Sequence, residues 1–389
     1  MSVSPEARFR RAVPSEVPYQ GFWQAGFEGA DHVNGSAVPL CMNTQTAHLR
    51  NASDDYHRLI ALGIRTVRES AGWRLIERGK GYDFANVGLR ARRARESGMQ
   101  ILWTFFHYGV PRDVDLFAES FADRFASYCG ALARYLKPFH QGGIVPVYTP
   151  INEISFLSWA ACETGLLHPH RGDRAAEGYE LKTQLVRASI AGCEAIWAAD
   201  PRARILNVDP LTHLAGDDES LVELAAFENG FQFQSWDMLC GRSEPQLGGS
   251  ARHLDLVGVN YYPSSQWEVR SRRTLDWPHD PRRRRFSRML VELHQRYRRP
   301  ITISETSHVG ESRSAWLEEI AREVRVAREQ GVPVHGLCLY PALDRPDWEQ
   351  PQRWHASGLW HVHPVSLRRR LNHSYATALG LAQSMLAEG

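Results

Sequence analysis

Residues 145–156 read VPVYTPINEISF, a short apolar run that ends in the polar pair Asn152 and Glu153. Residues 300–307 read PITISETS and repeat this arrangement, because Glu305 follows a run rich in β-branched side chains. Both runs are typical of buried β-strands. Polar residues at the carboxyl ends of parallel strands meet at one face of a sheet or barrel, where such folds hold their ligands. The two stretches therefore predict a pair of glutamates at the carboxyl face of a parallel sheet.

Strand-like runs and helix-like segments alternate along the whole chain. Eight runs with strand composition lie at residues 21–27, 66–69, 101–106, 145–149, 204–208, 254–262, 300–304 and 334–340. Eight segments with helical spacing lie at residues 54–62, 86–97, 121–136, 178–199, 221–234, 282–297, 314–330 and 364–386. This alternation predicts parallel strands joined by helical crossovers. Because there are eight repeats and neither a GxGxxG nor a P-loop sequence, we expect an α/β protein with a closed (β/α)8 TIM barrel rather than a doubly wound sheet.

The chain is expected to form one domain. Its 389 residues could supply two or three ordinary domains or one large barrel, but no Gly/Ser/Pro-rich linker, internal repeat or low-complexity tract divides it. We predict a single domain over residues 1–389, with an N-terminal extension at residues 1–18 and a long arginine-rich excursion from Val269 to Arg285.

Composition narrows the partners and the compartment. The 46 basic and 44 acidic residues leave a net charge of +2, too small to attract nucleic acid or a membrane surface by charge alone. The six cysteines are scattered without a CxxC pair, which predicts reduced thiols. The sequence has no apolar signal segment and no run of about 18 apolar residues. We expect a cytoplasmic protein that acts on a small molecule, with neither nucleic acid nor membrane as a partner, and a homo-oligomer remains open.

Two other features suggest chemistry only weakly. The pairs His168/His170 and His361/His363 have a spacing that could ligate a metal, but neither comes with cysteines or carboxylates at a familiar spacing, so no metal and no other cofactor is expected. The arginines between residues 270 and 285 favour a solvated surface. In the alternative interpretation they lie at the barrel mouth and bind an anionic leaving group or a phosphorylated sugar.

The two strand-end glutamates indicate a reaction class. Carboxyl groups that converge from two strands are the minimum equipment for glycoside hydrolysis, with one as general acid and the other as nucleophile or base. At these residues the sequence resembles the retaining (β/α)8 glycoside hydrolases of clan A, and most closely the family 1 β-glucosidases. The resemblance implies that Asn152 and Glu153 are the asparagine and acid/base pair after the fourth strand, and that Glu305 is the nucleophile after the seventh.

The second and third strands carry further parts of the resemblance. Residues 68–73, RESAGW, keep the family spacing Arg-x-Ser-x-x-Trp, which implies that Arg68 lies beneath the nucleophile. Residues 104–111, TFFHYGVP, match the family pattern Thr-Leu-x-His-Trp-Asp-Leu-Pro in register, although Tyr and Gly replace Trp and Asp. This match implies that His107 binds sugar hydroxyls.

The sixth strand, the eighth strand and the N-terminal region supply the rest. In GVNYYP the family pattern implies that Tyr262 bonds to the nucleophile and that Asn260 lies near the site. Residues 340–348, YPALDRPDW, resemble Trp-Ser-Leu-Leu-Asp-Asn-Phe-Glu-Trp, so Asp347 replaces the glutamate that holds the distal hydroxyls and Trp348 is the platform for the sugar ring. Ungapped alignment places His32 where the family has a sugar-binding glutamine.

Together these residues predict a retaining β-glycosidase that acts on a small soluble β-glycoside. Glu305 attacks the anomeric carbon, Glu153 serves as acid and then as base, and Asn152 bonds the 2-hydroxyl. A transglycosidase with the same residues is the second prediction. A catalytically silent barrel that binds a sugar or a partner protein is the third, and it is disfavoured because both glutamates and Arg68 are present. The identities of the glycone and the aglycone stay open.

Overall fold

The computed structural model describes residues 17–79, 81–140 and 142–387 of the chain. Eight parallel strands close into a barrel in the order β1-β12-β11-β9-β7-β6-β5-β2, and all of them coincide with predicted runs. Their bounds are β1 (Trp23–Gly26), β2 (Thr66–Ser70), β5 (Gln100–Phe106), β6 (Val147–Ile151), β7 (Arg204–Pro210), β9 (Leu256–Asn260), β11 (Ile301–Thr306) and β12 (Val334–Leu339). The predicted (β/α)8 TIM barrel is therefore confirmed.

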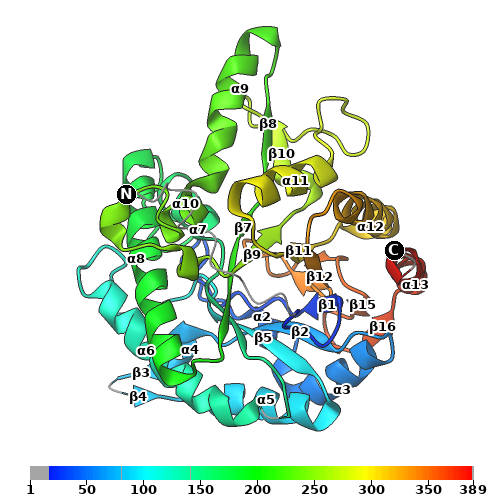
Figure 1. The fold of residues 1–389 in the computed structure, drawn as a ribbon. Coiled ribbons are helices and arrows are strands. Elements are labelled where there is room, and N and C mark those ends of the chain that lie inside the picture. The colour runs from blue at the N-terminus through cyan, green and yellow to red at the C-terminus, as the bar shows by residue number, and fades with distance from the viewer. Residues whose placement is uncertain (1–16, 80, 141, 388–389) are drawn as a thin grey trace, which may run out of the picture.

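Helices form a ring outside the strands (Figure 1). The longer ones are α3 (His48–Ile60), α5 (Ala85–Ser97), α6 (Phe121–Leu136), α8 (Ala175–Ala199), α11 (Phe286–Tyr297), α12 (Arg313–Glu329) and α13 (His373–Ala387). Shorter helices are α2 (Met42–Gln45), α4 (Trp73–Ile76), α7 (Ile154–Cys162), α9 (Val222–Glu228) and α10 (Gln234–Leu239). Because the helices cover the outer face, barrel strands such as β2, β5 and β9 are buried along their whole length.

The interior of the barrel holds its own apolar cluster. Leu102, Leu206 and Leu256 alternate along their strands with residues that pack against the outer helices, so they point inward. Tyr19 joins this cluster, and its hydroxyl lies 2.8 Å from the Thr302 hydroxyl. Packing of this kind fills the amino-terminal part of the barrel and leaves the carboxyl-terminal face for polar residues.

Four short two-stranded pairs lie outside the barrel. They are β3 (Glu77–Arg78) with β4 (Gly81–Tyr82), β8 (His213–Ala215) with β10 (Gln266–Glu268), β13 (Arg345–Pro346) with β14 (Trp354–His355), and β15 (Trp360–Val362) with β16 (Arg369–Leu371). The β8/β10 pair and α9 project from the barrel (Figure 1). In the part of the chain that the structure describes, no helix has the length and apolar character that crossing a bilayer demands.

Two helix predictions are wrong in part. The expected helix 221–234 is divided into α9, a 3-10 turn and α10, because the Asn229 side chain donates to the carbonyl groups of Ala225 and Leu214 and ends the first helix. The expected helix 364–386 begins only at His373, after β16, where the Asn372 side chain accepts from the amide of Tyr375 and caps the helix. Of the predicted N-terminal extension, residues 1–16 lie outside the described residues.

Candidate active site

Strand ends bring the two predicted glutamates to the same face of the barrel. Asn152 and Glu153 follow β6, and their amides donate to the carbonyl groups of Phe106 and Val208 on the strands at either side. Glu305 lies near the end of β11, where the pairing with β9 shifts its register. A register shift of this kind re-aims the side chain that follows it. These backbone features therefore help to orient both carboxyl groups, independently of the contacts that their side chains make.

Arg68 links the two strand ends. It is 2% exposed at β2, and its guanidinium donates to Oε1 of Glu305 and to Oδ1 of Asn152. The hydroxyl of Tyr262 donates to the other oxygen of Glu305 at 2.8 Å. Glu305 is therefore held by one cation and one hydroxyl donor in a buried position, which fixes the orientation of its carboxyl group.

The second carboxyl group has a different environment. Glu153 is buried, and it accepts a hydrogen bond from the hydroxyl of Tyr108 at Oε2. Burial, followed by the repulsion of the nearby Glu305 carboxylate, raises the pKa of Glu153 to about 8. At neutral pH Glu153 is thus protonated and can give up a proton, whereas Glu305 faces Arg68.

His107 is buried in the same cluster. Burial, and then the charge of Arg68, hold its pKa well below the usual value, so the imidazole is neutral. Its Nε2 lies 3.2 Å from the amide nitrogen of Asn152, and its Nδ1 lies 2.7 Å from the Ser70 hydroxyl. Since the amide of Asn152 can only donate, Nε2 accepts and the imidazole proton belongs on Nδ1.

Several buried polar atoms on this face have no protein partner among the described residues. They are both ring nitrogens of His32, Nε1 of Trp348 and the amide nitrogen of Asn260. The rings of His32 and Trp348 lie 4.5 Å apart, and the other end of the Asn260 amide accepts from the Ser304 hydroxyl at 2.7 Å. Unpartnered buried polar groups are rare in folded proteins. Their occurrence together is consistent with a ligand rich in hydroxyl groups.

Asp347 is engaged elsewhere. One carboxylate oxygen lies 2.7 Å from Nε2 of His355, and the other accepts from the amides of Glu349 and Gln350. The structure thus places the predicted distal-hydroxyl ligand in a turn on the rim of the site, with both oxygens already used.

A third buried carboxyl group was missed by the sequence analysis. Glu28 follows β1, is 6% exposed, and lies 3.3 Å from Nε of Arg345. Its other oxygen accepts from the amide of Ala30 and lies 3.4 Å from the hydroxyl of Tyr340. Burial raises the pKa of Glu28, and Glu305 adds to the rise, which places the two carboxyl groups in the same electrostatic environment. The available signal was its position directly after the first strand, the same position that identified Glu153.

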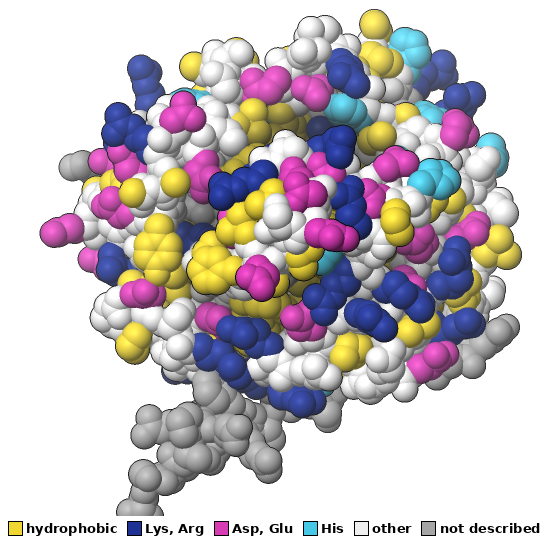
Figure 2. All heavy atoms as spheres, turned by 90° about the horizontal axis from the view of Figure 1, so that it is seen from above, with side chains coloured by type: hydrophobic (Ala, Val, Ile, Leu, Met, Phe, Trp, Pro, Cys, Tyr) yellow, Lys and Arg dark blue, Asp and Glu magenta, His cyan; other side chains and the backbone are white. Residues whose placement is uncertain are grey.

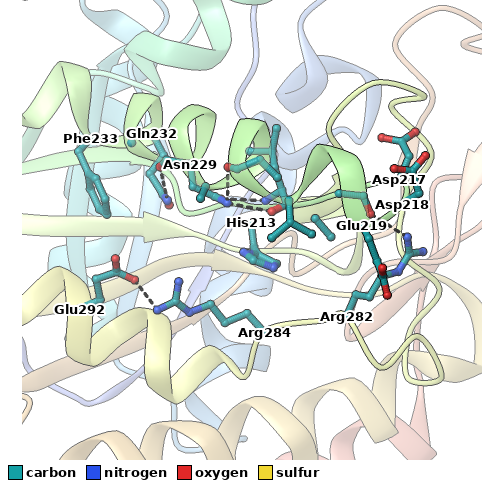
Figure 3. Close-up of a pocket in the computed structure, with 17 residues that line it drawn as sticks. His213, Asp217, Asp218, Glu219, Asn229, Gln232, Phe233, Arg282, Arg284 and Glu292 are labelled. Carbon is teal, nitrogen blue, oxygen red and sulfur yellow. Dashed lines mark hydrogen bonds and ion pairs between the residues drawn. The ribbon is translucent and has the colours of Figure 1, made fainter.

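Arg282 and Arg284 of the arginine-rich excursion border a cavity that is lined mainly by residues 213–233. About 670 Å³ in volume, it lies between α9 and α11, and Figure 3 shows Arg284 paired with Glu292 at one side of it. Arg282 pairs with Glu268 and Asp280. Among the described residues that line this cavity, neither predicted catalytic glutamate occurs. The ion pairs favour a structural role for these arginines, and the anion-binding alternative stays a prediction.

Neither a metal cluster nor a patch of one charge stands out. Within residues 17–79, 81–140 and 142–387, no group of three or more His, Cys, Asp and Glu side chains is arranged to hold a metal ion. Figure 2 shows basic and acidic side chains mixed over one face, with hydrophobic side chains in the hollows between them. This mixture agrees with the small net charge of the sequence.

Comparison with known proteins shows similarity of fold. No protein-family model matches the sequence, and no curated protein matches it. Among solved structures, an AHE enzyme from Alicyclobacillus herbarius aligns with a TM-score of 0.73 and 15% identity, over 95% of this chain and 98% of that one. A β-glucosidase from Thermotoga maritima in complex with castanospermine aligns with a TM-score of 0.73 and 16% identity, over 94% and 98% of the two chains. A β-glycosidase from Pyrococcus horikoshii aligns with a TM-score of 0.71 and 16% identity, over 87% and 85%. The chain therefore has the barrel fold of family 1 β-glucosidases and related glycosidases.

Proposed function

We propose that the protein is a retaining β-glycosidase that hydrolyses a small soluble β-glycoside in the cytoplasm. The observation that carries the proposal is the hydrogen-bonded bridge from Glu305 through Arg68 to Asn152, with Glu153 beside it. The bridge sets Glu305 against a cation, while burial and the Glu305 charge raise the pKa of Glu153, and this difference suits the division of roles that the retaining mechanism needs. The likeness to glycosidases of known structure supports the same assignment.

In the first step Glu305 attacks the anomeric carbon, and the bond from that carbon to the leaving oxygen breaks. Glu153 transfers its proton to the leaving oxygen, so the aglycone departs neutral. In the second step water attacks the anomeric carbon, Glu153 takes the proton of this water, and the ester bond to Glu305 breaks. Loss of the Glu305 charge in the intermediate removes the repulsion that raised the pKa of Glu153, which suits its change from acid to base.

The unpartnered buried groups are proposed to hold the sugar. His32 and Asn260 offer donors and acceptors for hydroxyl groups, and Trp348 offers an apolar ring face. His107 would bind a hydroxyl group in exchange for its contact with Asn152 or Ser70. Asn152 has both amide hydrogens directed at Tyr108 and His107. Its proposed bond to the 2-hydroxyl would therefore replace one of these two contacts.

Trapping of the intermediate tests the proposal. The protein is incubated with a pool of activated 2-deoxy-2-fluoro-β-glycosides of gluco, galacto, manno, fuco and xylo configuration, and its intact mass is measured before peptide mapping. We expect an adduct of one sugar on Glu305 and none on the Glu305→Gln variant. A folded protein that gains no adduct from any of the sugars would favour the silent barrel, or a phosphorylated glycone, which a sugar-6-phosphate set would then reveal.

Transglycosylation is separated from hydrolysis by the products. With an added alcohol or sugar acceptor, a hydrolase releases mainly free sugar, whereas a transglycosidase forms mainly the new glycoside from the same Glu305 intermediate.

A further inference from the structure

Tyr108 holds a position that the proposed mechanism has not yet used. It follows β5 and His107, it is 3% exposed, and its backbone has φ = 74°, a left-handed conformation that non-glycine residues seldom adopt. Such backbone conformations persist only where the surrounding structure imposes them. Here the conformation places the phenol between the side chains of Asn152 and Glu153.

The phenol both accepts and donates. The amide nitrogen of Asn152 lies 2.7 Å from the Tyr108 hydroxyl oxygen and can only donate to it. The single hydroxyl proton of Tyr108 is therefore free to donate to Oε2 of Glu153. Because Oε2 is occupied in this way, the transferable proton of Glu153 belongs on Oε1.

These contacts form one continuous chain between the two carboxyl groups. Arg68 donates to Glu305 on one side and to Oδ1 of Asn152 on the other, Asn152 donates to Tyr108, and Tyr108 donates to Glu153. In each of the three hydrogen bonds from Arg68 to Glu153, the donor lies on the Arg68 side and the acceptor lies on the Glu153 side. Hydrogen bonds in such a chain polarise one another, so a change in charge at one end alters the donor strength at the other.

We propose that Tyr108 is a positioning residue that makes the hydrogen bond on the acid/base Glu153 depend on the charge of the nucleophile Glu305. In the free enzyme the Glu305 carboxylate attracts Arg68, and Tyr108 donates only moderately to Glu153. In the glycosyl-enzyme Glu305 is a neutral ester, Arg68 pulls harder on Asn152, and Tyr108 donates more strongly to Glu153. Glu153 then becomes a carboxylate at the step in which it must accept a proton. The inference rests on the proposed function.

Several charged or titratable groups surround these hydrogen bonds, but the Tyr108 hydroxyl is the part in which this sequence differs from the resembled family pattern. The charged or titratable groups that face Tyr108 and Glu153 from neighbouring elements are Glu28 after β1, His107 after β5, Asp209 on β7, Tyr262 after β9 and Glu305 on β11. Arg68 on β2 reaches them through Asn152. An indole, which the resembled family pattern has at this position, has no hydroxyl to pass the polarisation on. The rings of Phe156 and Trp348, with centroids 5.4 and 5.8 Å from that of Tyr108, keep the phenol in place.

The test uses Tyr108→Phe and an aryl glycoside whose leaving group needs no protonation. With such a substrate, rapid-mixing kinetics separate formation of the glycosyl-enzyme, seen as a burst, from its hydrolysis, seen as steady-state turnover. We expect the acidic limb of the hydrolysis step to move to higher pH by about one unit, which slows hydrolysis roughly 10-fold on that limb. The basic limb of kcat/KM is measured with a poorly activated aryl glycoside, because only such a leaving group needs the proton of Glu153. This limb reports the free enzyme and should move by less, because the relay is weaker there.

Two further variants keep the test decisive. Tyr108→Leu also removes the hydroxyl and brings no new donor, so it should reproduce the shift, and a folding defect of the Phe variant does not leave the question open. Tyr179→Phe removes an exposed hydroxyl that bonds to Glu244 far from the site, and it should leave both limbs unchanged. Equal shifts of both limbs, or slower rates with no shift, would mean that Tyr108 only supports the structure. Absence of both a burst and a Glu305 adduct in the wild-type protein would overturn the proposed function together with this inference.

Discussion

Glu153 and Glu305 are the same amino acid in two surroundings, and the difference is made by their neighbours. Arg68 and Tyr262 both donate to Glu305, whereas Glu153 receives one hydroxyl and faces the charge of Glu305. A cation stabilises the charged form of a carboxyl group, and a nearby anion destabilises it. The raised pKa of Glu153 therefore follows from its burial and from the nearby Glu305 carboxylate, whereas Arg68 and Tyr262 hold Glu305.

The protonation of Glu153 predicts a limit on activity at high pH. The acid must carry its proton, and its pKa is about 8, so we expect kcat/KM for a poorly activated aryl glycoside to fall as the pH rises above about 8. The measurement is a pH profile between 5 and 10, with a 2,4-dinitrophenyl glycoside as the control because its leaving group needs no proton. A basic limb of the same size with both substrates would assign it to another group.

Glu28 is predicted to take part in recognition of the sugar. Since Asp347 is bound to His355, Glu28 is a buried carboxyl group on this face that could hold a distal hydroxyl, with Arg345 beside it. Loss of a hydrogen bond to a charged group costs about 1.5–3 kcal/mol, so Glu28→Gln should lower kcat/KM roughly 10- to 100-fold. Deoxy substrates identify the hydroxyl: the variant and the wild type should differ little on the substrate that lacks it. An equal loss on every deoxy substrate would show that Glu28 only maintains the structure.

Some residue roles were predictable from the sequence and others were not. Asn152 and Glu305 were expected at one face because each ends a recognisable strand, and the family resemblance placed Arg68 beneath Glu305. The structure brings the three side chains into contact. Gly109 could not be interpreted in this way. A side chain there would collide with the backbone of Asp31, a residue 78 positions away whose proximity no local pattern announces.

At the scale of elements, β2 and α3 are joined by a buried charged network. His48 on α3 lies 2.8 Å from Glu69 on β2 and 3.0 Å from Asp55, and Arg90 on α5 lies 2.6 Å from Glu69. Burial alone would lower the pKa of His48, but the two carboxylates outweigh burial and raise it. The network fixes the helix against the strand that carries Arg68.

His48→Gln tests this network through its pH dependence. A raised pKa means that protonated His48 stabilises the fold fully below its unfolded value of about 6.5, and that this stabilisation is lost as the pH rises through the folded value. We expect a loss of about 3–5 kcal/mol in the free energy of unfolding at pH 5.5, and a smaller loss at pH 9. Guanidinium unfolding at both pH values measures it, and His57→Gln at an exposed position of α3 is the matched control. A loss that is the same at both pH values would mean that folding leaves the pKa of His48 unchanged, and a larger loss at pH 9 would mean that His48 is neutral in the folded protein.

Element boundaries show where sequence patterns stop being sufficient. The barrel strands were predictable because each is a short apolar run between polar segments. The break between α9 and α10 was not predictable, because it depends on hydrogen bonds between the side chain of Asn229 and the backbone of Leu214, which lies on a different element. Patterns of apolar spacing record burial along one element and carry little information about a side chain that bonds to another.

At the scale of the whole molecule, the candidate site exists only when the barrel closes. Its residues extend from Glu28 to Trp348, and closure depends on β12 pairing with β1, where Leu337 lies opposite Trp23. Binding of a ligand to this site therefore stabilises the entire fold, since the unfolded chain offers no comparable arrangement.

This coupling predicts a thermal shift that does not rely on catalysis. A cationic iminosugar resembles the charge of the transition state and should be drawn to the carboxylates of the site. At a concentration of 100 Kd it adds about 2.7 kcal/mol, which for a chain of this length raises the Tm by about 3 °C. The shift should disappear in Glu305→Gln and persist in Glu244→Gln, which alters a carboxylate that bonds to Tyr179 and Gln246 instead of to the residues of the site. Iminosugars of gluco, galacto and fuco configuration then rank the glycone, because the ring hydroxyls they share with the substrate meet the same buried groups. An undiminished shift in Glu305→Gln would place the binding site outside the barrel mouth and separate the fold from the function proposed for it.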